Sequence, residues 1–276
     1  MAELIIVFRE VLEASLIIGI LYTYLNKIGN KEAISSLWKG VIYAIIASVI
    51  GSFLFQLISG GFQGQTEKLF EGFVMIFAAI ILGTMLIWMA KNQNMAQDLK
   101  EKAGDIISND KSTLFLGGIT GLAFISVFRE GIETILFLYG IILKEGSISI
   151  FMALFGGFLG LLAGYMIFVQ GRKVPLKKFF NVTSVLLIFV ASGMLAYGFH
   201  ELESAEIIPD SGRLWDINPS KFSDGSYPLM HDKGYVGSLI KGLFGYNGDP
   251  SIFEFIVWLS SLTGLLFLWN RARRKK

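Results

Sequence analysis

The chain has 276 residues and few charges for its length: 53% of its residues are hydrophobic and only 17% are charged. A soluble domain averages ~25% charged residues, so this composition indicates a multispanning membrane protein. High hydrophobicity argues against intrinsic disorder, and the absence of cysteine excludes disulfide scaffolds and thiolate metal sites. A net charge of +2 is too small for a typical nucleic-acid-binding protein.

Apolar runs of about 20 residues, the length that crosses a bilayer, predict seven transmembrane helices. In chain order they cover Leu4–Tyr24, Leu37–Ile58, Leu69–Ala90, Leu114–Leu143, Ile148–Val169, Phe179–Glu201 and Ile252–Trp269. The first run has neither the basic leading region nor the small-residue cleavage site of a signal peptide, so we expect it to be retained. The predicted fold is an all-α integral membrane protein with one membrane domain, residues 1–276.

The distribution of basic residues predicts the orientation in the membrane. Sixteen lysines and arginines lie at the connections after the first, third and fifth spans and in the C-terminal tail, against six at the other connections. Because positive residues stay cytoplasmic, we expect a cytoplasmic C-terminus and an outside N-terminus. Residues 251–276 then form the seventh helix and a basic cytoplasmic tail.

Two of the connections are long enough to have structure of their own. The cytoplasmic segment Asn92–Ser112 has acids at near-helical spacing and predicts a solvated surface helix. Residues 204–250 contain four of the five prolines and predict an irregular extracytoplasmic loop, folded in part over the outer mouth.

Six charged residues lie inside otherwise apolar spans, in two copies of one pattern. The first copy is Phe8–Glu13 (Phe-Arg-Glu-Val-Leu-Glu), and Phe128–Glu133 (Phe-Arg-Glu-Gly-Ile-Glu) follows 120 positions later. A charge inside a bilayer costs roughly 2.5–3.5 kcal/mol on insertion scales, so six uncompensated charges would cost on the order of 15 kcal/mol. The repetition of so costly a pattern indicates a functional site.

The spacing within each copy sets two carboxylates side by side, because residues three apart share one face of a helix. Carboxylate oxygens are the ligands of hard cations, so two such helices in contact predict a cation site. The alternative is that the charges only pair to hold helices together, but four acids exceed what two arginines need and leave a net charge of −2. The predicted ligands are Glu10, Glu13, Glu130 and Glu133, with the supporting Arg9 and Arg129 at the edge.

The offset between the copies also predicts an architecture. An odd number of spans separates the two motif helices, so they run in opposite directions. Residues 1–90 and 113–203 are then two inverted three-helix repeats with the site at their interface. In the second repeat, Gly156, Gly160 and Gly164 form a small-residue face that predicts close helix packing.

Two Arg-Glu-x-x-Glu helices in a seven-span chain resemble the oxidase-dependent iron permeases of fungi and their bacterial relatives. The resemblance covers most of the chain. It extends to Leu69–Gly72 (Leu-Phe-Glu-Gly), Met85–Met89 (Met-Leu-Ile-Trp-Met) and Phe199–Glu203 (Phe-His-Glu-Leu-Glu), which look like the bacterial branch. The family usually has glycine after the first motif glutamate; Gly131 keeps it and Val11 replaces it.

The resemblance implies uptake of iron into the cytoplasm, with iron as the transported substrate and no permanently bound cofactor. It implies a partner outside the membrane, an oxidase or an iron-binding protein, and favours ferric iron as the form supplied. The motif glutamates would bind the metal. The role of a permease in the cell membrane, and not of an enzyme, follows from the same resemblance.

Acids and one histidine near the outer ends of two spans are candidates for an access or relay site. The alternative is that they are ordinary polar residues at helix ends. They are Glu67 and Glu71 at the third span, and His200, Glu201 and Glu203 at the sixth. Other functions stay open: transport of another divalent cation, proton-coupled exchange, or a membrane di-metal oxidase. The oxidase is disfavoured because the chain has two histidines and no Glu-x-x-His pair.

Overall fold

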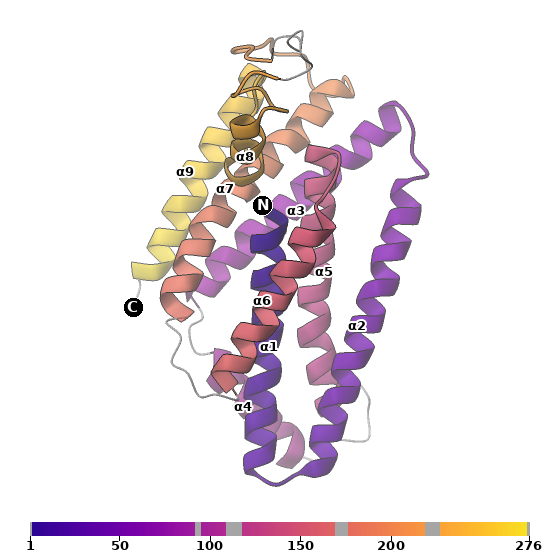
Figure 1. Ribbon diagram of the computed structural model, residues 1–276, viewed down its shortest axis with the longest axis vertical. Helices are drawn as coiled ribbons and strands as arrows, with labels where there is room; N and C mark the ends of the chain where they lie inside the picture. The colour runs from indigo at the N-terminus through magenta and orange to yellow at the C-terminus, as the bar shows by residue number, and fades with distance from the viewer. Residues whose placement is uncertain (1, 92–94, 109–117, 169–175, 219–226, 275–276) are drawn as a thin grey trace.

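The computed structural model describes residues 2–91, 95–108, 118–168, 176–218 and 227–274 (Figure 1). Most of these residues are helical. One isolated bridge, between Arg213 and Ser251, is the β-structure in these residues. The helices are α1 (Ala2–Lys27), α2 (Lys31–Ser59), α3 (Gln65–Lys91), α4 (Met95–Ser108), α5 (Ile119–Glu145), α6 (Ile150–Phe168), α7 (Leu176–Ser204), α8 (Tyr235–Phe244) and α9 (Ile252–Arg274).

Each of the seven predicted spans coincides with one long helix, although Leu114 and Val169, two predicted ends, lie outside the described residues. Five helices are long and apolar enough to cross a membrane: α2, α3, α6, α9 and the Phe180–Ser204 part of α7. Helices α1 and α5 are as long, with 26 and 27 residues, but they carry the six motif charges. A multispanning membrane fold is therefore confirmed, while the count of seven spans stays a prediction.

The helices pack in three close pairs: α1 against α6, α2 against α5, and α3 against α7. The glycine face predicted on α6 is confirmed, since Gly156, Gly160 and Gly164 are buried against α1. A Cβ atom on Gly160 would lie 2.9 Å from the carbonyl oxygen of Phe8. Small residues of this kind let two helix backbones approach in the absence of a hydrophobic driving force between them.

The outward faces of the bundle are apolar. On α2, Ile45, Val49 and Phe53 are exposed, and on α6 Leu154 and Phe158 are exposed in the same way. Contiguous apolar surface on this scale is unusual for a soluble protein and is what a lipid-facing helix requires. The core lies between α1, α3, α5 and α7, where Ile6, Met75, Leu82 and Phe137 are fully buried.

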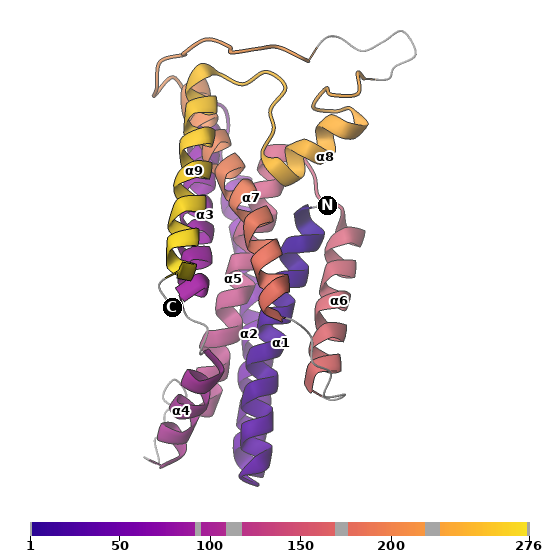
Figure 2. The ribbon, with the colours of Figure 1, turned by 90° about the vertical axis from the view of Figure 1, so that its left-hand side faces the viewer.

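The surface helix predicted within Asn92–Ser112 is confirmed as α4, at the opposite end of the molecule from α8 (Figure 2). It is amphipathic. Leu99 and Ala103 are buried against the α1–α2–α5 cluster, while Asp98 and Asp105 are exposed. One face of α4 therefore belongs to the bundle, which a fully solvated helix would not show.

The segment of residues 205–251, called the outer segment after its predicted orientation, is not wholly irregular where the structure describes it. It contains α8, which the sequence analysis missed because this apolar stretch of ten residues is too short to span a membrane. The segment leads into α9 with Ser251 as the N-cap residue, whose hydroxyl accepts a hydrogen bond from the Glu254 backbone N–H at 3.0 Å. One of the four prolines on which the loop prediction rests, Pro219, lies outside the described residues.

Candidate metal centre

The two motif helices, α1 and α5, run in opposite directions and pack together at mid-length (Figure 1). Their contact brings three motif carboxylates together: oxygens of Glu10, Glu130 and Glu133 lie within 4.8 Å of one another. The three residues are 1%, 2% and 6% exposed, respectively. Such a spacing fits one metal ion bridging ligands from both helices.

Arg9 of α1 is fully buried against α3 and compensates one of the two charges of the first motif. Its guanidinium forms ion pairs with Glu10 at 2.6 Å and with Glu13 at 2.8 Å. On its other side it contacts the sulfur atoms of Met85 and Met89 in α3. The three-carboxylate group includes Glu10 but not Glu13, although Arg9 binds both side chains.

Arg129 pairs with the second motif in the same pattern but in a different environment. It binds Glu130 at 2.5 Å and approaches Glu133 at 3.6 Å. Its side chain is 42% exposed, against 0% for Arg9. Its guanidinium carbon lies 5.5 Å from the centre of the Trp88 ring, within cation–π range. The buried carboxylates are therefore covered on one side by the fully buried Arg9 and on the other by the partly exposed Arg129.

The arginines leave part of the carboxylate capacity unused. The Oε2 atoms of Glu10, Glu130 and Glu133 are buried and accept no hydrogen bond from the residues that the structure describes. A buried acceptor without a donor costs roughly 1–3 kcal/mol, and more when it is charged. Three such atoms close to one another are a donor set for a hard cation.

The access residues predicted near the outer end of the bundle form a second acidic group. Gly72 of α3 and Gly198 of α7 cross closely, since a Cβ atom on Gly72 would lie 3.0 Å from the Gly198 carbonyl oxygen. This crossing brings Glu71 into electrostatic range of Glu201, which is 8% exposed and hydrogen-bonded with a tyrosine, Tyr197. Glu67 is exposed on the first turn of α3.

His200 and Glu203 have different partners. The imidazole Nδ1 of His200 lies 3.4 Å from a carboxylate oxygen of Glu254. Glu203 accepts hydrogen bonds from the hydroxyls of Ser211, at 2.9 Å, and Ser251, at 2.5 Å, and so ties α7 to the outer segment. The sequence analysis missed Glu254, which is 4% exposed; the signal was an acid in the first turn of an apolar span.

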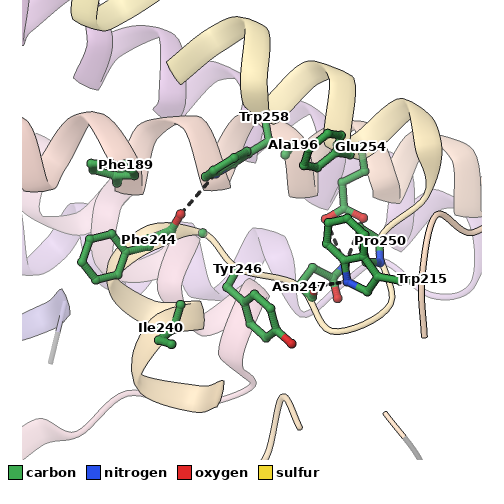
Figure 3. Close-up of a pocket in the computed structure, with 12 residues that line it drawn as sticks. Phe189, Ala196, Trp215, Ile240, Phe244, Tyr246, Asn247, Pro250, Glu254 and Trp258 are labelled. Atoms are coloured by element: carbon green, nitrogen blue, oxygen red, sulfur yellow. Dashed lines mark hydrogen bonds between the residues drawn. The ribbon is translucent and has the colours of Figure 1, made fainter. Parts of the chain in front are cut away.

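A pocket of about 390 Å³ lies beside this outer group, between α7, α8 and α9 (Figure 3). Its walls are mainly apolar and include Phe189, Phe244 and Trp258, whose indole N–H donates to the Phe244 carbonyl at 3.1 Å. Glu254 stands at one edge, held by the Asn247 amide at 3.0 Å. Glu254 is the acid that lines this pocket, and it already accepts a hydrogen bond from Asn247. The pocket therefore lacks the donor set of a metal site.

The profile of the Iron permease FTR1 family matches residues 1–271, almost the entire chain. The chain belongs to this family. It is therefore a multispanning membrane permease and not an enzyme, as the resemblance implied.

Relatives of the permease are similar over nearly their full length. An uncharacterised protein of Archaeoglobus fulgidus is 32% identical over 99% of this chain and 95% of its own. The ferrous iron permease EfeU of Yersinia pestis is 29% identical over 96% of this chain and 91% of its own. The protein of the same name in Escherichia coli O6:H1 is 31% identical, covering 92% and 89%. No solved structure matches the permease.

Proposed function

We propose that this permease carries iron across the cytoplasmic membrane by binding it between the two motif helices. The observation behind the proposal is the group of three buried carboxylates, Glu10, Glu130 and Glu133, each with an oxygen that accepts no hydrogen bond from the described residues. Glu13 is the fourth ligand in this proposal, and it joins when a cation competes with Arg9 for its carboxylate. Carboxylates replace the hydration shell that the ion loses on leaving water.

The charge of the site bears on the oxidation state. Four ionised glutamates and two arginines carry a net charge of −2. A divalent ion makes the buried group neutral, whereas a trivalent ion leaves a net positive charge in a low-dielectric environment, which is costly. Relatives of the permease are named for ferrous iron. We therefore propose ferrous iron as the cargo; the ferric preference expected from the sequence stays a prediction.

The helix pairing supports inverted repeats formed by α1–α3 and α5–α7. A two-fold axis that exchanges these repeats turns the α1–α6 pair into the α5–α2 pair and returns the α1–α5 and α3–α7 pairs to themselves. All four of these contacts are present. Inverted repeats place a substrate site at their interface near mid-membrane, where rocking of one repeat exposes it to either side in turn.

We also propose an orientation of the permease in the membrane and a partner protein. The basic residues favour a cytoplasmic α4 and an extracytoplasmic outer segment. An iron-binding protein outside the membrane, or an oxidase if the cargo is ferric iron, would then deliver iron near the group that contains Glu71, Glu201 and Glu254. This group is acidic and lies at the end of the bundle that also carries α8.

The test is uptake of iron by the purified permease in proteoliposomes that contain a sealed iron-sensitive dye. We expect uptake of ferrous iron under anaerobic conditions, and none above background when Glu10→Gln or Glu133→Gln removes one carboxylate without changing its size. Glu101→Gln, on exposed α4, is the matched control and should transport normally. Full uptake by both site variants would contradict the proposal. Uptake of ferric iron alone would support the ferric cargo predicted from the sequence.

A further inference from the structure

A second pocket, of about 240 Å³, lies on the α4 side of the metal centre. It is enclosed by α1, α4, α5 and Trp88 of α3. The polar residues that line it are Asp98 and Lys102 of α4 and Ser126 and Arg129 of α5. The volume is sufficient for several water molecules, each of which occupies about 30 Å³ in the liquid. The proposed function gives no role to this pocket or to α4.

Arg129 belongs both to this pocket and to the metal centre. Its guanidinium binds Glu130 and Glu133, and its side chain also lines the pocket. It is thus the barrier between the carboxylates and the α4 end of the molecule. Arg9 has no equivalent position, since it is fully buried against Met85 and Met89.

A cation that binds Glu130 and Glu133 competes with the Arg129 guanidinium for the same oxygens, and the two positive charges repel each other strongly at low dielectric. The guanidinium can move into the pocket that its side chain already lines without entering the apolar core. There Asp98 supplies a new negative partner. The Trp88 ring, already in cation–π range, offers a continuous favourable surface for this movement.

We propose that the pocket between α1, α4 and α5 is the inner exit of the permease, that Arg129 is its gate, and that Asp98 receives the guanidinium when a cation displaces it. The proposal rests on the proposed function of the carboxylate group. Asp98 and Trp88 act through Arg129 and are positioning residues. Without Asp98, the guanidinium keeps its place on Glu130 and Glu133, and the ion leaves slowly.

The first experiment compares Asp98→Asn with Asp105→Asn in the proteoliposome assay. Both acids are exposed on α4, but only Asp98 lines the pocket. We expect Asp98→Asn to lower the maximal rate of ferrous iron uptake about tenfold and Asp105→Asn to leave it unchanged. The half-saturating iron concentration should change little in either variant, because the ligands are intact. Equal rates in the two variants would overturn the proposal.

The second experiment uses the absence of cysteine from the natural chain. A cysteine in place of Ser126 reports on the pocket through its reaction with a membrane-impermeant, positively charged thiosulfonate. We expect labelling in inverted membrane vesicles but not in intact cells, and slower labelling with ferrous iron present, because Arg129 then fills the pocket. In the Asp98→Asn background, iron should not change the rate.

The outcomes separate this proposal from the one on which it rests. If Glu133→Gln transports like the wild type, the metal centre itself is wrong. If Glu133→Gln is inactive but Ser126→Cys is labelled only from outside, or iron never alters its labelling, the carboxylate site stands and the gate is wrong. An Asp210→Cys variant, exposed in the outer segment, is the control for labelling from the opposite side.

Discussion

Val11 of α1 packs directly on Gly160 of α6, where a Cβ atom on the glycine would lie 3.0 Å from the Val11 Cβ atom. In the second motif the sizes are reversed: Gly131 of α5 faces Ser48 of α2, and it is the motif residue that has no side chain. A close helix approach needs one small residue at the contact, and either helix can supply it. The departure of Val11 from the family pattern is therefore compensated across the interface.

Gly160→Ala should destabilise the contact between α1 and α6. The added methyl group would lie 2.9 Å from the Phe8 carbonyl oxygen, and backbone cannot yield as a flexible side chain can. Overpacking of this kind typically costs about 1–3 kcal/mol. The measurement is the melting temperature of the detergent-solubilised protein by size-exclusion chromatography after heating. Gly264→Ala, where no atom lies within 4 Å, is the control, and an equal melting temperature for the two variants would contradict the packing argument.

Arg9→Leu should reduce the stability of the folded protein severely. The substitution leaves the buried Glu10 and Glu13 without the guanidinium that binds both of them. Removing one partner of a buried ion pair costs about 3–5 kcal/mol. The yield of monodisperse protein and its melting temperature measure the effect.

A double substitution distinguishes charge from packing in this prediction. Adding Glu13→Gln to Arg9→Leu removes one of the uncompensated charges and should recover part of the lost stability. Arg129→Leu should cost less than Arg9→Leu, because the Arg129 side chain is 42% exposed and its ion pairs are therefore weaker than those of the fully buried Arg9. If the double variant recovers no stability, and if Arg9→Leu and Arg129→Leu lose equal stability, charge compensation is not the reason for the effect of Arg9.

Glu201→Gln should weaken access of iron to the transport path. Glu201 and Glu71 form the acidic group where α3 and α7 cross, and rings of acids raise the local concentration of cations. We expect a several-fold rise in the half-saturating iron concentration with an unchanged maximal rate. Glu203→Gln is the comparison, because Ser211 and Ser251 already occupy its carboxylate. A larger rise for Glu203→Gln would contradict this assignment.

The membrane helices could be predicted from sequence because lipid imposes a simple rule. Each backbone polar group must be paired within its own segment, so length and hydropathy locate helices such as α2 and α6. This rule does not locate α8, whose ten residues are too few to span a membrane. The position of α8 depends on contacts with α7 and α9, such as that between Phe244 and Phe189 of α7.

The candidate metal centre could be proposed from the sequence because its charges are expensive and repeated. The pattern around Glu10 and Glu130 predicted that carboxylates of the two helices meet, but the different burial of the two arginines depends on tertiary packing. Arg9 is buried because Met85 and Met89 lie against it, and both are more than 70 positions away in sequence. Glu254 was missed for the same reason: its contacts come from the folded chain, with His200 of α7 and Asn247 of the outer segment.

The most direct measurement of the central claim is equilibrium binding of ferrous iron to the purified permease under anaerobic conditions, with X-ray absorption to identify the ligand atoms. The account predicts one tightly bound iron per chain with an oxygen-dominated shell, lost in Glu130→Gln and retained in Glu101→Gln. Binding that is unchanged in a variant with Glu10, Glu130 and Glu133 all replaced by glutamine would contradict it.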